Sequence, residues 1–336
     1  MKFKYLFLSL IFLCQVCCIQ IFSQSVNWEK LNIKLPSYAS SFGFNSKGYI
    51  YIGTRNWGIF RSKDSGASWE RLYEGLSLDR VDCIFETSDK NLLAGVSFGG
   101  HLIMGPKPLG IFRSEDDGDT WENVLETIWV WKILKDSKNF LYACTNSFNI
   151  STKMVRSDDN GESWERIDDK LPEYDIVDMA ISPIDIIIAY KYNGSFFSSY
   201  DRGENWNQLD NEFEAGYSSL LYNSKGVLFA YNDSSGLCKS FDSGKSWYKT
   251  NLNLPEYSFR SLAIDKKNRL FVVTTKYGLF VSQDNGITWN QIKNGLLNKN
   301  ITAVGFDNQN FIYLGIIQPE RKYEEDYYIV LRGCYK

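Results

Sequence analysis

The stretch SQDNGITW, residues 282–289, recurs along the chain with little change. Five earlier segments share its frame of Ser, Asp, Gly and Trp: SKDSGASW at 62, SEDDGDTW at 114, SDDNGESW at 157, SYDRGENW at 199 and SFDSGKSW at 240. Their starting positions lie 52, 43, 42, 41 and 42 residues apart. A fixed period of this length indicates a repeat architecture.

One complete unit, residues 259–292, shows what is repeated. It contains four short apolar or β-rich runs, FRSLAID, RLFVVTT, LFVS and ITWNQI, with turn residues between them. Runs of this kind predict four antiparallel strands. No long segment has the 3.6-residue period of a helix. Four-stranded units that repeat about every 42 residues are typical of the blades of a β-propeller.

The two ends of the chain complement each other. Trp28 in VNWEKLNI matches the strand that follows the motif, but no motif precedes it. At the other end, ITAVGFD (301–307), FIYLGII (311–317) and YYIVLR (327–332) match the first three strands of a unit. Pairing strand 26–33 with strand 327–332 would close the ring without an exposed sheet edge. We therefore predict an all-β, seven-bladed propeller of four-stranded antiparallel blades; six blades with frayed ends is the alternative.

The motif falls on the hairpin between the third and fourth strands. Asp284 is expected to accept hydrogen bonds from its own turn, and Gly286 to supply a positive φ. Trp289 is expected to pack between neighbouring blades. The same structural roles fall to Asp64, Gly66, Trp69, Asp116, Gly118, Trp121, Asp159, Gly161, Trp164, Asp201, Gly203, Trp206, Asp242, Gly244 and Trp247. Calcium needs more oxygen ligands than D-x-G offers, so we expect the box to stabilise its hairpin and to bind no metal.

The pattern S-x-D-x-G-x-[ST]-W resembles the Asp-box, or BNR repeat, of sialidase-like, sortilin-like and photosystem II assembly-factor-like propellers. The copy at 199 departs from it, with Asn205 in place of Ser or Thr. The resemblance extends over roughly residues 25–331. It implies the propeller fold and a box at the blade periphery, away from the active face. It does not imply one activity, because these families share the fold and differ in function.

Composition and the N-terminal segment indicate the class of partner and the location of the protein. The net charge of −3 does not favour nucleic acid as a partner. Lys2 and Lys4 precede the apolar run YLFLSLIFL (5–13), and Ser23 precedes Gln24. We predict a secretory signal peptide over residues 1–23, one propeller domain over 24–336, and a secreted, periplasmic or extracellular monomer without an integral membrane span. A signal anchor, or a lipid anchor at a cysteine of this segment, is the alternative.

Histidine and cysteine are too sparse to suggest metal or cofactor chemistry. His101 is the single histidine. After the signal, the cysteines are Cys83, Cys144, Cys238 and Cys334, whose spacing matches neither a disulfide framework nor a zinc site. We interpret all four as buried small hydrophobic residues and expect no cofactor.

Long loops and unusual tryptophans locate a candidate binding region. The connections between second and third strands open on the face opposite the boxes, here called the long-loop face. They are longest at 97–110 and 318–327, with smaller loops at 146–153 and 54–58. Long loops on a rigid scaffold often carry sites. The candidate ligand-binding residues are Arg55, Trp57, Arg80, Trp129, Trp131, Lys132, Arg260 and Arg321. The alternatives are inter-blade packing for the tryptophans and a hydrated channel lining for the charges.

These observations favour a secreted, non-catalytic binding or assembly propeller that engages a protein or a glycan. The alternative is an exo-acting glycoside hydrolase of sialidase-like type. The resemblance implies that a sialidase would carry an Arg-Ile-Pro signature before the first box, but KLPSYASSFGF (34–44) contains no arginine. Asp82 and Asp178 are the catalytic candidates, and glycosidase chemistry would require their carboxylates about 5–10 Å apart.

Overall fold

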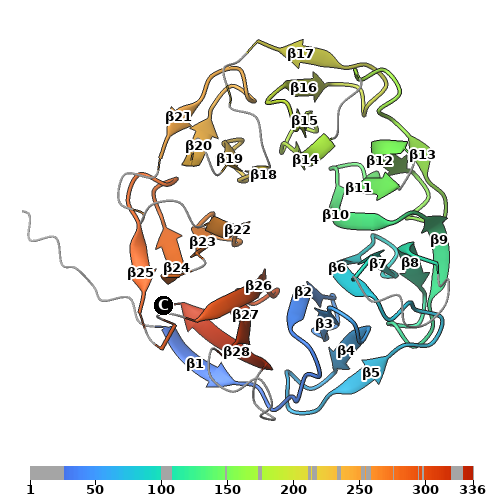
Figure 1. Cartoon of the computed structure of the whole chain (residues 1–336), viewed down its shortest axis with the longest axis vertical. Helices are drawn as coiled ribbons and strands as arrows, with labels where there is room; N and C mark the ends of the chain where they lie inside the picture. The colour runs from blue at the N-terminus through green and yellow to red at the C-terminus, as the bar shows by residue number, and fades with distance from the viewer. Residues whose placement is uncertain are drawn as a thin grey trace, which may run out of the picture.

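The strands form seven sheets arranged around a common axis (Figure 1). The computed structural model describes residues 26–99, 108–147, 150–172, 176–210, 213, 218–232, 236–250, 254, 259–274, 276–293, 295–296, 299–318 and 328–335. Within these ranges it has 28 strands in seven four-stranded antiparallel sheets. The predicted all-β, seven-bladed propeller is therefore confirmed, and the six-bladed alternative is wrong.

Each blade places its first strand on the inside of the ring and its fourth on the outside (Figure 1). Blades 1 to 3 are β2 (Ala39–Phe44), β3 (Ile50–Thr54), β4 (Ile59–Ser62), β5 (Glu70–Leu72); β6 (Arg80–Glu86), β7 (Leu92–Ser97), β8 (Gly110–Ser114), β9 (Glu122–Glu126); and β10 (Trp129–Lys135), β11 (Leu141–Ser147), β12 (Ile150–Ser157), β13 (Glu165–Arg166).

Blades 4 to 6 are β14 (Ile176–Ile181), β15 (Ile187–Lys191), β16 (Phe196–Ser199), β17 (Asn207–Leu209); β18 (Ser218–Tyr222), β19 (Leu228–Asn232), β20 (Gly236–Ser240), β21 (Tyr248–Lys249); and β22 (Phe259–Ile264), β23 (Leu270–Thr274), β24 (Gly278–Ser282), β25 (Asn290–Ile292). Blade 7 is β26 (Asn300–Phe306), β27 (Phe311–Ile317), β28 (Tyr328–Tyr335) and β1 (Val26–Lys30).

Blade 7 is completed by the first strand of the chain. β1 pairs antiparallel with β28, in a register that runs from Val26 opposite Tyr335 to Lys30 opposite Leu331. This confirms the predicted closure, with different bounds. β1 ends at residue 30 rather than 33, and β28 continues to residue 335 rather than 332. Joining the two ends gives the last sheet a fourth strand and leaves no break in the ring.

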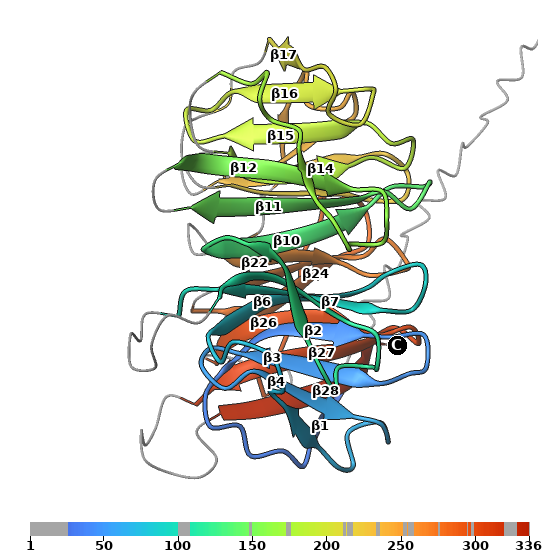
Figure 2. The ribbon, with the colours of Figure 1, turned by 90° about the vertical axis from the view of Figure 1, so that its right-hand side faces the viewer.

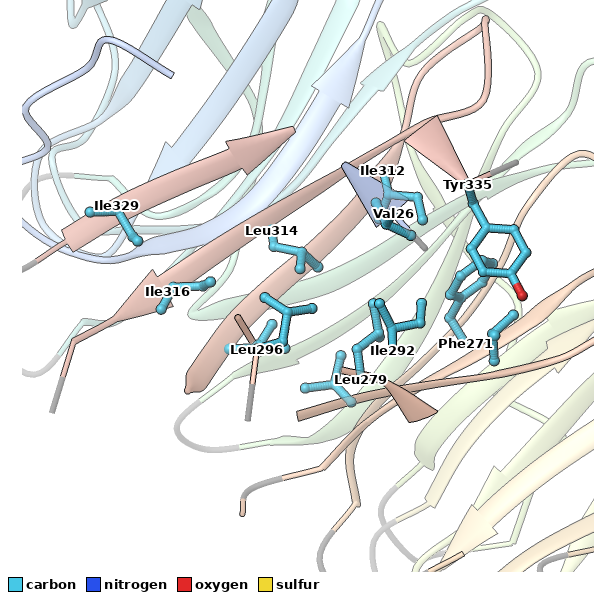
Figure 3. Packing of buried hydrophobic residues seen from close by; sticks show 13 residues of the cluster. Val26, Phe271, Leu279, Ile292, Leu296, Ile312, Leu314, Ile316, Ile329 and Tyr335 are labelled. Atoms are coloured by element: carbon cyan, nitrogen blue, oxygen red, sulfur yellow. The ribbon is translucent and has the colours of Figure 1, made fainter. Parts of the chain in front are cut away.

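The hydrophobic core lies between adjacent blades. β23 and β24 are buried along their whole length, because each blade is covered on both faces by its neighbours. Between blades 6 and 7, Phe271 and Leu279 pack against Ile312, Leu314 and other residues of blade 7 (Figure 3). Blade-to-blade burial therefore replaces a single central core.

Three of the four cysteines are embedded in this packing. Cys144 and Cys238 are buried and Cys83 is partly covered. Burial raises the pKa of the Cys83 thiol to about 12. Cys334 is exposed on β28, so the expectation that all four cysteines are buried is wrong for this residue.

The strands run from one face of the ring to the other, so the described connections are divided between the two faces (Figure 2). The turns between first and second strands share the box face. They form a second repeat, which begins at residues 45, 87, 136, 182, 223, 265 and 307. The residue three positions later always has a positive φ, between 60° and 83°. A side-chain oxygen at the first position usually caps the turn, as Asp136 does for the N–H groups of Lys138 and Phe140.

Candidate functional site

The Asp-box at 282–289 is closed on itself by hydrogen bonds. Asp284 Oδ1 accepts from the Thr288 N–H at 2.9 Å, and Oδ2 accepts from the Thr288 hydroxyl at 2.6 Å. Ser282 Oγ accepts from the Gly286 N–H at 2.8 Å. Trp289 Nε1 donates to the Gly286 carbonyl at 3.1 Å. The Ser, Asp and Trp side chains of the motif thus all have partners within the hairpin.

The Ser and Asp contacts recur in the other five boxes, with a glycine φ between 79° and 99° across all six. The Trp contact to the box glycine recurs at Trp69, whereas Trp206 donates to the Ile167 carbonyl. In the divergent copy, Asn205 donates its backbone and side-chain N–H groups to Asp201 at 2.9 and 2.8 Å. It therefore replaces the usual Ser or Thr without loss of contact. Burial raises the Asp284 pKa, but hydrogen bonds from Thr288 and Ser282 outweigh it and leave this pKa lowered. In the described part of the chain, no group of three or more His, Cys, Asp or Glu side chains is placed to hold a metal ion.

The box also forms hydrogen bonds with the preceding blade. A basic side chain on the third strand donates to the carbonyl of the left-handed residue in the next box. The contacts are Arg61 to Asp117 at 2.7 Å, Arg156 to Arg202 at 2.9 Å, Lys239 to Asn285 at 3.1 Å and Arg332 to Ser65 at 2.7 Å. Sequence reasoning missed these residues. For three of them the signal was the Arg or Lys directly before the box serine, in FRS, VRS and CKS; Arg332 precedes no box.

On the long-loop face, Arg55 joins blade 1 to its neighbours. Its Nε donates to the Gly99 carbonyl at 3.3 Å, and Nη1 donates to the Tyr38 hydroxyl at 3.2 Å. Its guanidinium also lies 5.6 Å from the centre of the Tyr38 ring. Arg55 is therefore held in place while part of it remains exposed.

Arg80 and Asp82 lie beside this arginine in blade 2. Arg80 contacts both oxygens of Asp82, at 2.7 and 2.8 Å. A Cβ placed on Gly99 would be 3.4 Å from the backbone nitrogen of Arg80 and 2.6 Å from Asn56 Oδ1, so these segments are in close contact. Asn56 Oδ1 is buried and has no hydrogen-bond partner among the described residues. The structure thus brings the backbones of Arg55 and Arg80 together around Gly99 at the blade 1–2 junction, beside an acceptor that has no partner among the described residues.

Trp57 lies in the same loop and is 42% exposed. The Arg71 guanidinium lies 4.8 Å from the Trp57 ring centre and 5.5 Å from that of Tyr73. This stack presents two exposed aromatic rings around a fixed cation. A surface of this composition suits contact with a partner, because aromatic residues and arginine are enriched in interfaces.

The other two candidate tryptophans differ from Trp57. Trp131 is the bulged residue of β10, where the register shifts between Val130 and Lys132. It packs against the buried cluster between blades 3 and 4, which includes Met179. Trp129 is the first residue of β10 and is partly buried. The inter-blade packing considered as the alternative therefore describes Trp131.

Lys132 and Asp178 form a buried link. Lys132 Nζ donates to Asp178 Oδ2 at 2.6 Å and to the carbonyls of Met179 and Leu220 at 3.1 and 2.9 Å. Asp178 is 2% exposed. Asp178 and Asp82 lie on β14 and β6, and blade 3 stands between their blades. The two carboxylates proposed for catalysis are therefore each bound to a cation and belong to different blades.

The remaining candidates are peripheral to this arrangement. Arg260 is the bulged residue of β22, is exposed, and donates from Nη1 to Asn300 Oδ1. Arg321 and His101 lie outside the described residues.

Comparison with known proteins agrees with this geometry. The BNR/Asp-box repeat model matches residues 280–291. The chain is a β-propeller that carries a BNR/Asp-box repeat. No curated protein matches it. Among the residues that the structure describes, no helix has the length and apolarity needed to cross a membrane.

Solved structures of several functions share the fold of this Asp-box propeller. YCF48 bound to D1 peptide is 18% identical, with a TM-score of 0.65 over 91% of this chain and 94% of that chain. A catalytically inactive virginiamycin B lyase from Staphylococcus aureus, solved with quinupristin, is 11% identical, with a TM-score of 0.67 over 92% and 100%. An extracellular domain of a putative hybrid two-component system from B. thetaiotaomicron is 19% identical, with a TM-score of 0.65 over 92% and 39%. At these identities the similarity establishes the fold alone.

Proposed function

We propose that this propeller is a non-catalytic binding or assembly protein that engages a protein segment through the long-loop face of blades 1 and 2. The observation that carries the proposal is the fixed cluster of Arg55, Asn56 and Trp57 next to the Arg80–Asp82 pair. It combines an exposed aromatic ring, a positioned guanidinium and a buried acceptor without a described partner. A peptide can supply the apolar contact and the N–H donor together.

Pre-organisation supports binding at this cluster. Arg55 is held by Tyr38 and Gly99, and the Trp57 ring by Arg71. Side chains already fixed in one conformation lose less entropy when a partner binds. YCF48, which shares the fold, has been solved with a bound peptide. A protein partner is therefore favoured here, and a glycan is the alternative outcome.

The glycoside hydrolase alternative has less support. A glycosidase needs two carboxylates that flank one bond. Asp178 accepts hydrogen bonds from Lys132 and two backbone N–H groups, and Asp82 is bound through both oxygens to Arg80. A sialidase-like site would also require arginines free to bind a substrate carboxylate. Arg80 and Arg260 are engaged by Asp82 and Asn300.

We further propose a secreted or periplasmic monomer whose signal peptide, residues 1–23, is removed. The extracellular domain among the similar structures is compatible with such a location. Mass spectrometry of the protein isolated from its own host tests this, since a mature N-terminus at Gln24 is expected. An intact Met1, or a lipid on Cys17 or Cys18, would instead support the anchored form.

The binding proposal is tested by site-specific photo-crosslinking of the full chain in its host. A benzoyl-phenylalanine at position 57 should yield one discrete protein adduct, and one at Tyr248, which is 54% exposed on the box side, should not. Arg55→Ala should reduce the adduct while the variant remains folded at the labelling temperature, which its melting curve checks. Equal adducts from both positions would contradict the proposal. Binding on a glycan array that is lost in Arg55→Ala, or turnover of a sialoside, would favour the alternatives.

A further inference from the structure

A cavity of about 370 Å³ lies between blades 7 and 1 on the box face, away from the long-loop face. Its lining includes Tyr49 of blade 1, Ser65 of the first box and Asp307 of blade 7. Lys47, Lys63 and Arg332 complete the set of charged side chains around it. Its size lies in the range of small-ligand pockets, about 300–1,000 Å³.

The cavity lies beside a box whose left-handed residue has a short side chain. In the fourth box, Arg202 has a φ of 60° and extends to the first turn of the preceding blade, where Nε lies 2.9 Å from Asp136 Oδ2. Asp117 and Asn285 bridge in the same way in the second and sixth boxes, to Asn45 and Asn223. The first box has Ser65 at this position, with a φ of 59°. Serine cannot span the gap, so the space between Ser65 and Asp307 stays open.

Asp307 is the counterpart of Asp136. Asp307 Oδ1 accepts from the N–H groups of Gln309 and Phe311 at 2.9 Å, and Oδ2 accepts from the Tyr313 hydroxyl at 3.0 Å. Asp136 has the same three kinds of contact, the last one with Tyr142 at 3.2 Å. Asp136 also binds the Arg202 guanidinium, and the described residues offer no such contact to Asp307.

Charge decides which ligand the cavity suits. Three of the four charged side chains in its lining already have acidic partners: Lys47 with Asp117 at 2.5 Å, Lys63 with Glu70 at 3.3 Å and Arg332 with Glu29 at 2.7 Å. No cation among the described residues forms an ion pair with Asp307. Asp307 is therefore the charged side chain of the lining that lacks an ion-pair partner among the described residues. A planar cationic donor would complete the contacts of its carboxylate.

We propose that this cavity binds a guanidinium group, presented by an arginine of a partner protein, in the place that Arg202 occupies between blades 3 and 4. The site is independent of the proposed binding function of the long-loop face. Its position on the opposite face would allow the ring to hold two partners at once.

The test titrates Nα-acetyl-arginine amide into the full-length protein and measures binding by calorimetry. A single side chain should bind with a Kd on the order of 1 mM. Asp307→Asn and Ser65→Arg should each weaken binding at least tenfold, the second because its own guanidinium fills the site. Ser65→Arg should also raise the melting temperature. The neutral citrulline analogue should not bind.

Two matched variants separate this site from non-specific attraction. Ser243→Arg introduces the same charge at the equivalent position of the fifth box, where φ is 58° and the opposing turn begins with Ser182, and it should leave binding unchanged. Arg202→Ser should open a second site at Asp136 and raise the stoichiometry from one to two.

Equal affinity in the wild type, Asp307→Asn and Ser65→Arg, or binding of the citrulline analogue, would overturn the proposal. So would no binding at concentrations about tenfold above this Kd. Free arginine that binds tenfold more tightly than the capped amide would identify an amino acid, rather than a protein, as the source of the guanidinium.

Discussion

Lys132 Nζ lies 2.6 Å from Asp178 Oδ2, and the two residues belong to the inner strands of blades 3 and 4. Both also contact Leu220 of blade 5, through its carbonyl at 2.9 Å and its N–H at 2.7 Å. One ion pair therefore connects three consecutive blades. Lys132, considered as a ligand-binding residue, and Asp178, considered as a catalytic one, thus have a clear role in holding the ring together.

Replacing Lys132 with Met should lower the free energy of unfolding by about 3 kcal/mol, because it leaves the Asp178 carboxylate buried without a cation. Chemical denaturation measures this loss. The double variant Lys132→Met/Asp178→Leu should recover part of it, since no charge then remains buried. A single variant as stable as the wild type would show that the pair contributes nothing to the ring.

Stability should fall as the pH drops from about 4 towards 2. The hydroxyl and N–H of Ser68, with the Ser62 hydroxyl, lower the pKa of Asp64 to about 2, against about 3.9 for an unfolded aspartate. The pKa values of the other five box aspartates are also lowered. Because the unfolded chain binds more protons in this window, protonation favours unfolding.

Urea denaturation at a series of pH values tests this dependence. The stabilisation is fully present above the unfolded pKa and is lost as the pH falls through the folded one. Asp64→Asn should make the slope shallower, since it removes one of the six titrating groups. A midpoint that does not change between pH 4 and 2 would argue against box carboxylates as the source of stability.

Ring closure can be captured covalently. Asn27 of β1 is directly opposite Cys334 of β28, and Cys334 is exposed. Facing Cα atoms in antiparallel strands are about 4.5–5.5 Å apart, which suits a disulfide. Asn27→Cys should therefore form an intramolecular disulfide on mild oxidation, seen as faster migration on a non-reducing gel. Lys30→Cys, which faces Leu331, is the control and should leave both thiols free.

Two tryptophans that looked alike in the sequence should respond differently to mutation. Trp131→Ala should lower the free energy of unfolding by about 3 kcal/mol, because it leaves a cavity between blades 3 and 4. Trp57→Ala should change it by less than about 0.5 kcal/mol, since this ring is largely at the surface. Thermal denaturation of both variants measures the contrast. Similar losses would indicate that Trp57 is also part of the packing.

The fold could be predicted because the box combines residues that few other turns require together. Gly286 needs a positive φ, and Asp284 needs the N–H groups that this turn exposes. The second repeated turn was missed because different residues serve it equally well. Asp136, Asn223 and Ser182 all provide a capping oxygen, so NSKGV, DSKNF and SPIDI share a geometry without sharing letters.

The site was harder to predict because it depends on pairing between blades and on irregular register. A bulge makes Trp131 the unpaired residue of its strand, and Asp82 and Arg260 hold the same place in β6 and β22. An insertion of one residue changes the face to which a side chain points. Six of the seven inner strands carry such a shift, so counting residues from the box could not assign these side chains to the channel or to the packing.

The pairing of β1 with β28 also sets the order of events during synthesis. Val26 must wait for Tyr335, more than three hundred residues later, before it meets its partner. Six blades can form while translation continues, because each is made from a contiguous segment. The seventh cannot, and until β28 leaves the ribosome β1 is an unpaired strand of the kind that invites association with other chains. The slowest and most vulnerable step in making this protein should therefore be its last one.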